Sequence, residues 1–343
     1  MKIKIINDNY CKSWNDYLIS KKKYSPYAFY EWSKIIENTY DISCIMIAAF
    51  NSKSEICGIM PLYKIKDYFN KLTLYSFKYS FIYEDDSVCK GLLEFVDNYS
   101  KTNNINGLVI SPHNIKNKLN EFDFIRTKTV KMEIENSEEK MWSVIRSKTR
   151  NMIKKARKEN ITIRHGDKNI KEFYEIYKCR MLKKGVRVHS FNFFDNIKST
   201  LNNNMEVFIA EKDNNIIGTM FLVFFGENGA YAYGGSKISK GASPNQLLLW
   251  EMLKYCMSNG IKNLDLGESD EGSGVYKFKI WFGGKPEEVI YFSKKYNLIS
   301  PFSSLNLFVG NFKRIISYFL IKYGTDYLKE VAGLWKRTKG PLF

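Results

Sequence analysis

The chain has 343 residues, a length that favours two domains over a single core. Its 53 Lys and Arg outnumber 36 Asp and Glu, and the net charge of +17 favours anionic partners such as RNA, phosphorylated carriers or a membrane face. A solvated, lysine-rich surface is the alternative. The six cysteines form no C-x-x-C pair and the three histidines are far apart, so we expect no metal site.

The N-terminus and the hydropathy bear on location. Residues 1–8 are too short and polar for a secretory signal, and no run approaches the roughly 18 apolar residues that span a bilayer. Several cysteines lie inside apolar stretches, as in proteins of a reducing compartment. We therefore expect a cytoplasmic protein, either soluble or peripheral at the inner face of the membrane.

A strand-turn-strand pattern occurs twice along the chain. Residues 45–50 and 56–62 make the first hairpin, and residues 207–211 and 216–222 make the second. In both hairpins the second strand carries Ile-x-Gly-x-Met. The shared pattern predicts that one structural unit is repeated, although chance similarity of two such units is the alternative.

The segments after the two hairpins are also alike. Residues 88–99 and 246–257 have helical apolar spacing, and each segment ends near a glycine and leads into a further strand, at 108–110 and 263–266. The order hairpin, helix, strand is typical of a mixed sheet with helices on both faces. The sequence therefore predicts an α/β fold built from two tandem units.

The boundaries of these units follow from charge and amphipathicity. A charged run at 133–140 begins a new helix, which divides the chain into a first unit, 1–135, and a second unit, 136–298. Residues 299–343 are predicted to form a helical tail in which 312–323 is amphipathic. We expect this tail to pack on the first unit; a basic helix at the membrane surface is the alternative.

Residues 142–159 are predicted to form one strongly basic helix. Its apolar stripe consists of Trp142, Ile145, Met152, Ile153 and Ala156. Seven basic residues surround this stripe, with no acid before Glu159: Arg146, Lys148, Arg150, Lys154, Lys155, Arg157 and Lys158. Such density favours a phosphate or RNA contact, and a solvated face is the alternative. Arg150 favours phosphate, because a guanidinium binds phosphate bidentately.

Residues 264–284 combine an apolar strand, a glycine-rich acidic loop and a Phe278-Lys279 pair among aromatic residues. A lysine in an apolar setting can stabilise a developing oxyanion without competition from water, so Lys279 is a candidate catalytic residue. Its alternative is a surface charge. Glu268 is a candidate general base among the acidic residues of the loop, most of which we expect to be solvated.

Several segments in order resemble the FemABX group of peptide-bond-forming transferases, whose fold is a doubled GNAT acyltransferase unit. Arg150, Asn151 and Lys154 fall in a stretch similar to the group's R-N-x-x-K-A helix. Residues 173–180 resemble the next helix, which carries an arginine, here Arg180. Residues 231–236 resemble a tyrosine-rich strand. The likeness covers residues 142–295 and is looser before them.

The resemblance continues through the helix start at 243–250 and the segment 265–284. It implies attack of an amine, or of a hydroxyl, on an activated acyl group. The implied catalytic residues are Lys279, Phe278 and Glu268. The implied substrate-binding residues are Arg150, Asn151, Lys154, Arg180, Tyr231, Tyr233, Asn245 and Tyr276. Alternation along a strand predicts that Tyr231 and Tyr233 share one face.

The resemblance also implies partners. The acceptor would be an anionic or lipid-linked cell-envelope glycan or peptidoglycan-like precursor, with tRNA or the inner membrane surface as further partners and no DNA. No cofactor is expected to be tightly bound, and the acyl donor is aminoacyl-tRNA or acyl-CoA. Residues 239–245 match the pyrophosphate loop of acyl-CoA enzymes poorly, with one glycine and a proline.

Two alternatives stay open. The first is an acetyl-CoA-dependent N-acetyltransferase of polysaccharide biosynthesis, which would bind CoA. The second is of another class, a basic RNA-binding module without catalysis. Such a module would bind RNA with a steep salt dependence and would transfer no acyl group.

Overall fold

The computed structural model gives the fold of most of the chain. It describes residues 1–296 except 22–23, 67–70, 114–118, 120, 167–168, 184, 186–187 and 238–242. The tail predicted at 299–343, with its amphipathic segment, lies outside the described residues. None of the helices in the described ranges has the length and apolar character that crossing a bilayer requires.

The chain contains both strands and helices, as predicted for an α/β fold. The first half contains β1 (Lys2–Ile6), α1 (Cys11–Ser20), α2 (Tyr30–Tyr40), β2 (Cys44–Phe50), β3 (Ile56–Lys66), β4 (Leu72–Tyr75), β5 (Ile82–Tyr83), α3 (Asp86–Thr102), β6 (Gly107–Ile110) and β7 (Asp123–Glu133). The second half contains α4 (Glu138–Val144), α5 (Ser147–Lys158), β8 (Thr162–His165), α6 (Ile170–Lys183), α7 (Phe191–Leu201), β9 (Met205–Lys212), β10 (Asn215–Phe225), β11 (Asn228–Ser236), α8 (Pro244–Ser258), β12 (Asn263–Glu268), α9 (Gly274–Trp281) and β13 (Lys285–Lys295).

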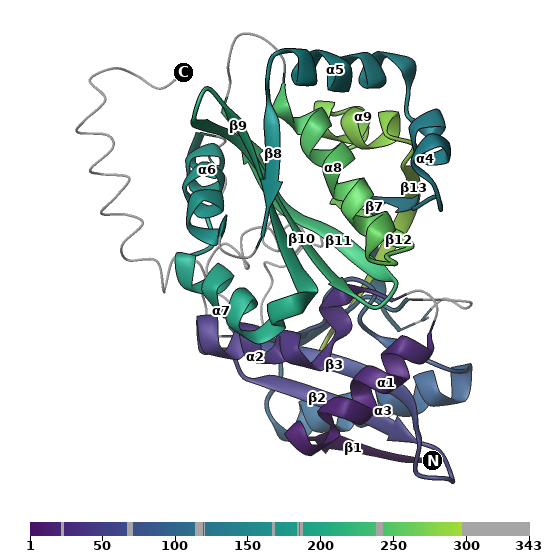
Figure 1. The fold of residues 1–343 in the computed structure, drawn as a ribbon. Coiled ribbons are helices and arrows are strands. Elements are labelled where there is room, and N and C mark those ends of the chain that lie inside the picture. The colour runs from purple at the N-terminus through teal and green to yellow at the C-terminus, as the bar shows by residue number, and fades with distance from the viewer. Residues whose placement is uncertain are drawn as a thin grey trace, which may run out of the picture.

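The two units have the same topology, which confirms the predicted repeat. In the first, β2 and β3 form an antiparallel hairpin and β4 runs parallel to β6. In the second, β9 and β10 form the hairpin and β11 runs parallel to β12. Each parallel pair is joined by a crossover that contains a helix, α3 or α8 (Figure 1).

The glycine of each Ile-x-Gly-x-Met strand lies beneath that crossover helix. A Cβ atom on Gly58 would come within 2.6 Å of Val88 Cγ1 on α3, and one on Gly218 within 2.9 Å of Pro244 Cγ on α8. Both positions need glycine because the helix approaches the strand this closely. The repeated motif therefore marks an equivalent packing position in each unit.

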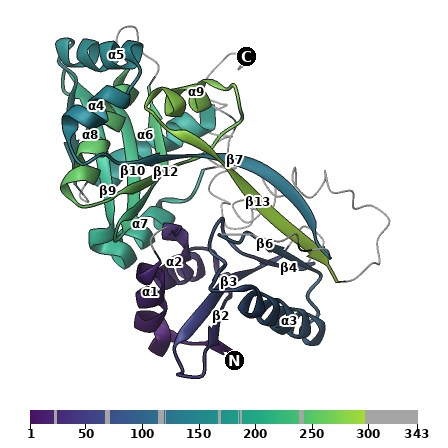
Figure 2. The ribbon, with the colours of Figure 1, turned by 90° about the vertical axis from the view of Figure 1, so that its right-hand side faces the viewer.

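A single sheet joins the units. Its strand order is β1-β2-β3-β4-β6-β13-β7-β12-β11-β10-β9-β8, with β5 paired to β3. The long strands β7 and β13 pair antiparallel and run together from one unit to the other (Figure 2). The C-terminal end of β13 pairs with β6, while β7 pairs with β12. The division at residue 135 stays a prediction, since the sheet continues across it.

Helices cover both faces of the second unit's strands. In Figure 1, α6 and α7 lie on one face and α8 on the other. The core on the α8 side contains Ile153, Leu248 and Leu264. The core on the α6 side continues into the first unit, so that Trp32 and Phe29 share one cluster with Phe173 and Phe194. This shared core brings α2 of the first unit against α7 of the second.

The basic segment predicted as one helix at 142–159 is two helices, α4 and α5. Ile145 between them has an extended conformation, with φ −73° and ψ 132°. The backbone N–H of Arg146 donates to Trp281 O (2.9 Å), and the Arg146 guanidinium lies 4.9 Å from the Trp281 ring. The end of α9 thus takes the hydrogen bond that a continuous helix would use.

Candidate active site

The site begins where two parallel strands separate. The pairing of β11 with β12 extends only from Asn228 and Asn263 to Ala230 and Asp265, although β11 continues to Ser236. Ligands of α/β sheets commonly bind in a crevice at the carboxyl ends of parallel strands. The opening is therefore a place where the two strands could receive a substrate.

Lys279 lies at this opening. It is on α9, whose first turn is capped by Ser273, and its side chain is turned inward so that only 3% of the residue is exposed. Its Nζ donates to the carbonyl oxygens of Gly267 (2.7 Å) and Glu268 (3.2 Å) and to Ser269 Oγ (3.4 Å). The ammonium therefore holds the end of β12 and the loop that follows it.

Burial changes the titration of Lys279. It lowers the pKa of the ammonium from 10.5 to about 8, because water no longer solvates the charge. The carboxylate of Asp265 opposes this effect, whereas the positive charge of Lys78 adds to it. Lys279 is therefore charged at neutral pH, and it loses its proton as the pH rises through about 8.

A buried polar cluster contacts the end of β12 through Asp265. Asp265 Oδ2 pairs with Lys78 Nζ (2.7 Å), and Asp265 Oδ1 accepts from Thr129 Oγ1 (2.6 Å) and from Gly267 N (2.7 Å). Lys78 also donates to Thr129 Oγ1 (3.1 Å). The cluster joins the first unit, β7 and β12, and it holds the backbone N–H of Gly267, the residue whose carbonyl oxygen contacts Lys279.

The pKa of Asp265 follows from this cluster. Burial raises it, but the charge of Lys78 and the hydrogen bonds from Lys78, Thr129 and Gly267 outweigh burial and hold the pKa below its ordinary value. Such a carboxylate positions its neighbours and is a poor base. The sequence pattern did not single out Lys78 or Thr129, because neither has a motif and both are far from Asp265 in the chain.

The other residues predicted on this segment have separate environments. Glu268 directs its carboxylate to Thr127 Oγ1 (2.9 Å) and Tyr291 OH (3.0 Å), and only its carbonyl contacts Lys279. Phe278 is half-buried, with its ring 5.2 Å from that of Phe282, and Tyr276 is half-buried in the same core. Phe278 and Tyr276 therefore pack α9 onto the sheet.

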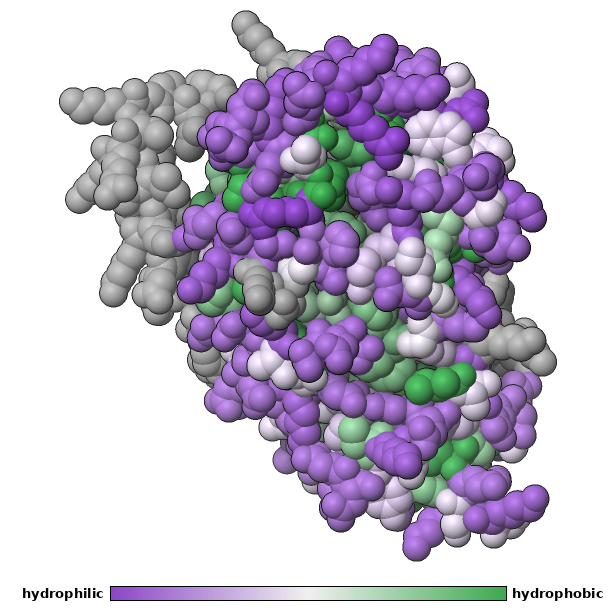
Figure 3. All heavy atoms as spheres, viewed as in Figure 1, coloured by the Kyte–Doolittle hydropathy of each residue, from purple (hydrophilic) through white to green (hydrophobic). Residues whose placement is uncertain are grey.

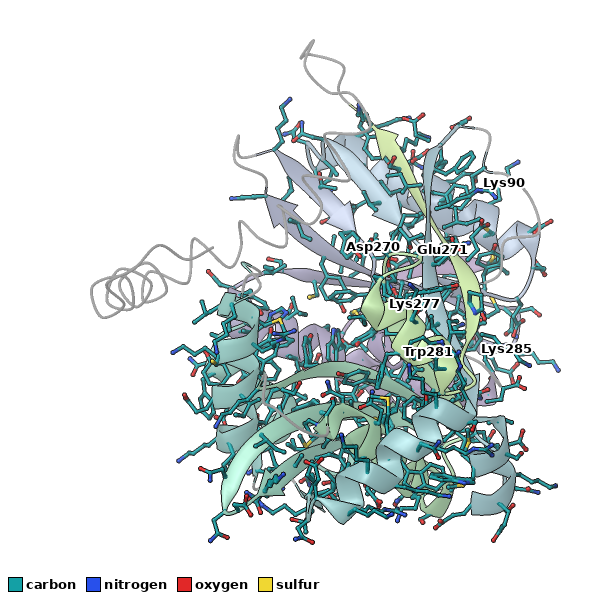
Figure 4. The ribbon with its side chains drawn as sticks, turned by 90° about the horizontal axis from the view of Figure 1, so that it is seen from above. Lys90, Asp270, Glu271, Lys277, Trp281 and Lys285 are labelled. Atoms are coloured by element: carbon teal, nitrogen blue, oxygen red, sulfur yellow. The ribbon has the colours of Figure 1, made fainter. Side chains whose placement is uncertain are left out.

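The loop before α9 presents its acidic residues outward. Figure 4 shows Asp270 and Glu271 in this loop and Lys277 and Trp281 on the helix. Glu271 pairs with Lys128 of β7 at 2.6 Å, and both side chains are exposed. These acids contribute to an exposed rim, as the sequence predicted for most of the loop.

Tyr231 and Tyr233 do not share a face, contrary to the prediction. Tyr233 pairs with Phe221 and Tyr231 with the next residue, Leu222, so Ala232 is an extra residue in β11. Such a β-bulge interrupts strict alternation. Tyr231 consequently packs in the core on the α8 side, whereas Tyr233 packs in the core shared by both units.

Arg180 and Asn245 both lie at the carboxyl end of β11. Gly235 leaves room for Arg180, because a Cβ atom there would approach the Arg180 Cβ to 2.9 Å. Asn245 Nδ2 donates to Ser236 Oγ (3.1 Å). Residues 239–242, part of the stretch that matches the pyrophosphate loop of acyl-CoA enzymes poorly, lie outside the described ranges.

Arg150, Asn151 and Lys154 lie on α5. Arg150 is half-buried, and the other two are exposed. Their helix forms the upper edge of the molecule in Figure 1, and this edge is hydrophilic in Figure 3. Towards the end of α5, Arg157 pairs with Glu251 at 3.0 Å. The described residues hold no group of three His, Cys, Asp or Glu side chains that could bind a metal ion.

Comparison with known proteins finds similarities in the second half of the chain. Residues 143–279 match the family described as "Acetyltransferase (GNAT) domain". A stretch of 152 residues is 23% identical to UDP-N-acetylmuramoylpentapeptide-lysine N(6)-alanyltransferase of Weissella viridescens, and it covers 42% of this chain. That stretch spans 45% of the relative, so the match extends over less than half of its length.

Solved structures share the fold along nearly the whole chain. A crystal structure of FemX matches with a TM-score of 0.71 at 16% identity, covering 87% of this chain and 98% of that one. A tandem GNAT protein from the clavulanic acid biosynthesis pathway matches with a TM-score of 0.54 at 8% identity, covering 87% and 100%. L-PGS from Bacillus licheniformis matches with a TM-score of 0.54 at 11% identity, covering 86% of this chain and 99% of that one. The predicted tandem GNAT fold is confirmed.

Proposed function

We propose that this chain, a FemABX-like protein of the GNAT superfamily, transfers an aminoacyl or acyl group onto an amine or hydroxyl of a cell-envelope precursor. The observation that carries the proposal is the buried ammonium of Lys279 at the opening between β11 and β12. A charge kept from water is most effective where negative charge develops during acyl transfer.

The proposed reaction uses the donor's carbonyl carbon and the acceptor's nucleophile. Attack places negative charge on the carbonyl oxygen, and Lys279 stabilises that oxyanion. Its contact with Ser269 Oγ, at 3.4 Å, is the longest of its three hydrogen bonds and the one an oxyanion would replace. Glu268 is the proposed general base, because its carboxylate is exposed at the end of β12, where it accepts hydrogen bonds from Thr127 and Tyr291.

The acyl donor is proposed to be aminoacyl-tRNA. The exposed basic side chains of α5, among them Lys148 and Lys154, offer phosphate contacts, and Arg150 adds a guanidinium. Acetyl-CoA is the second candidate donor, because the family matched by residues 143–279 is described as an acetyltransferase.

The acceptor is proposed to be an anionic or lipid-linked glycan or peptidoglycan-like precursor, including one of exopolysaccharide synthesis. The relative from Weissella viridescens acts on a lysine N6 amine of a UDP-N-acetylmuramoylpentapeptide. Arg180, with Asn245 nearby at the end of β11, would bind an anionic part of such a precursor. This role places the chain in the cytoplasm or at the inner face of the membrane.

A transfer assay tests the proposal. Alanyl-tRNA or acetyl-CoA is incubated with UDP-N-acetylmuramoylpentapeptide and the full chain, and the product is identified by mass spectrometry. Lys279→Ala should lower the rate by about 10²–10³, the usual loss when an oxyanion partner is removed. The control is Lys277→Ala, which changes an exposed lysine of the same helix (Figure 4) and should leave the rate unchanged.

The results separate the candidates. Transfer from alanyl-tRNA supports the proposal, and transfer from acetyl-CoA alone supports the acetyltransferase. RNA binding with a steep salt dependence and no transfer from either donor would favour the non-catalytic module. A Lys279→Ala protein with full activity would remove Lys279 from the mechanism.

A further inference from the structure

An aromatic cavity of 190 Å³ lies between the two units. Its walls come from α2, β3 and β4 on one side and from α7 and β11 on the other. Nine of its twelve lining residues are aromatic or histidine, and the other three are isoleucines. None of these lining residues carries a carboxylate, a guanidinium or an ammonium.

Two of the lining residues each carry an unpartnered polar atom. Trp32 Nε1 and Tyr63 OH are buried, in residues exposed by only 2% and 1%, and neither has a hydrogen-bond partner among the described residues. Buried polar groups are normally paired, because an unmade hydrogen bond is costly. The indole N–H can only donate, so a group that pairs with it must provide an acceptor.

The histidine of the cavity adds no charge at neutral pH. Burial lowers the pKa of His189 to about 4, so the imidazole is neutral. Its Nδ1 lies 2.5 Å from Tyr40 OH, which pairs these two polar groups with each other. Among the lining residues, Trp32 Nε1 and Tyr63 OH therefore remain as buried polar atoms without a partner among the described residues.

The cavity adjoins the candidate active site. Tyr27 and Tyr75, two of its lining residues, have pKa values raised by burial and further by the carboxylates of Asp265 or Glu268. Tyr233 enters the cavity from β11 because of the bulge after Tyr231. An occupant would therefore lie near the end of β12.

We propose that this cavity binds an uncharged, ring-sized group bearing one acceptor oxygen, which Trp32 and Tyr63 hydrogen-bond. The size follows because an apolar cavity of about 150 Å³ holds one benzene molecule. Charge is excluded because a buried ion without a partner is strongly disfavoured. This proposal rests on the proposed function: the bound group would be part of the donor or of the acceptor of the transfer.

Binding is tested by NMR without any transfer reaction. Benzamide is the probe, since it joins a ring to a carbonyl oxygen, and it is titrated while the six indole N–H signals are recorded. The Trp32 signal is identified by its loss in Trp32→Phe. We expect that signal to shift in a saturable way. No saturable shift would overturn the proposal.

Matched probes and variants test the chemistry. Benzoate, which is charged, and toluene, which lacks the acceptor, should each bind at least about tenfold more weakly than benzamide. Tyr63→Phe should weaken benzamide by about tenfold. The control is Trp250→Phe, whose buried N–H is also unpartnered but lies outside this cavity, and it should bind benzamide normally. Equal binding of benzoate or toluene would overturn the assigned ligand class.

A competition measurement assigns the group. If benzamide competes with the acceptor, the ring-sized group belongs to the acceptor. If it competes with the donor, the group belongs to the donor. Inhibition of neither, in an active enzyme, would overturn the link to the transfer. Binding of benzamide by a chain that transfers nothing would keep the cavity site and contradict the proposed function.

Discussion

Lys279 combines a charge with burial, and this combination predicts how activity depends on pH. Its pKa is lowered to about 8 by loss of solvation, so the ammonium that we propose stabilises the oxyanion is lost as pH rises through that value. We expect the transfer rate to fall about tenfold per pH unit above pH 8. The measurement is the rate from about pH 6 to pH 10 with saturating substrates.

Lys279→Arg provides the comparison, because a guanidinium stays protonated over this range. Its rate is expected to be lower at neutral pH, since the planar group fits the Gly267 and Glu268 carbonyls differently, but nearly constant above pH 8. If both proteins lost activity in parallel as pH rose, another group would control the titration.

The residues of the site differ in how visible they are in the sequence. Lys279 and Glu268 lie in one short segment, so their glycine-rich and aromatic context could be recognised directly. Lys78 and Thr129 reach Asp265 only through folding. The prediction that Tyr231 and Tyr233 share one face was wrong for a related reason, because a bulge is defined by the pairing with the neighbouring strand.

At the scale of elements, the repeated Ile-x-Gly-x-Met strand gives a stability prediction. In Gly58→Ala the new Cβ would lie 2.6 Å from Val88 Cγ1 and 2.9 Å from Leu92 Cδ1. Because Val88 and Leu92 of α3 would have to shift to make room, we expect a loss of about 1–3 kcal/mol in the free energy of unfolding. Urea denaturation followed by circular dichroism measures it.

Gly274→Ala serves as the matched control. Gly274 opens α9, has no atom within 4 Å of its added Cβ and does not have a positive φ. Alanine is the better helix former, so this variant should be unchanged or slightly more stable. If both variants lost the same free energy of unfolding, the close packing of α3 on β3 would not be the reason for glycine at position 58.

The order of elements was predictable where periodicity and turns are local. The hairpins, the crossover helices and the strands after them all follow from spacing within short windows. The break between α4 and α5 could not be predicted from the sequence, because the apolar stripe continues through it. The helix is stopped by Trp281, more than a hundred residues away, which accepts the Arg146 N–H and stacks on its side chain.

At the scale of the whole molecule, the repeat predicted two units but not how they join. Pairing of β13 with both β6 and β7 gives the units one sheet. The core containing Phe29 and Phe173 also extends across both. Such long-range pairing is set by the assembled fold and leaves no periodic signal in the strand itself. The consequence is that neither unit should unfold alone.

Phe225→Ala tests this coupling. Its ring stacks on Phe29 of the first unit, with centroids 3.5 Å apart, and its carbonyl accepts from Tyr24 OH (3.0 Å). Removing the buried ring should cost about 3–5 kcal/mol, yet thermal unfolding should remain one transition because the shared sheet is intact. Phe124→Ala, at a residue 41% exposed, should cost less than about 1 kcal/mol. Two separate transitions in calorimetry, in either variant or in the unaltered chain, would mean that the common sheet does not make the units cooperative.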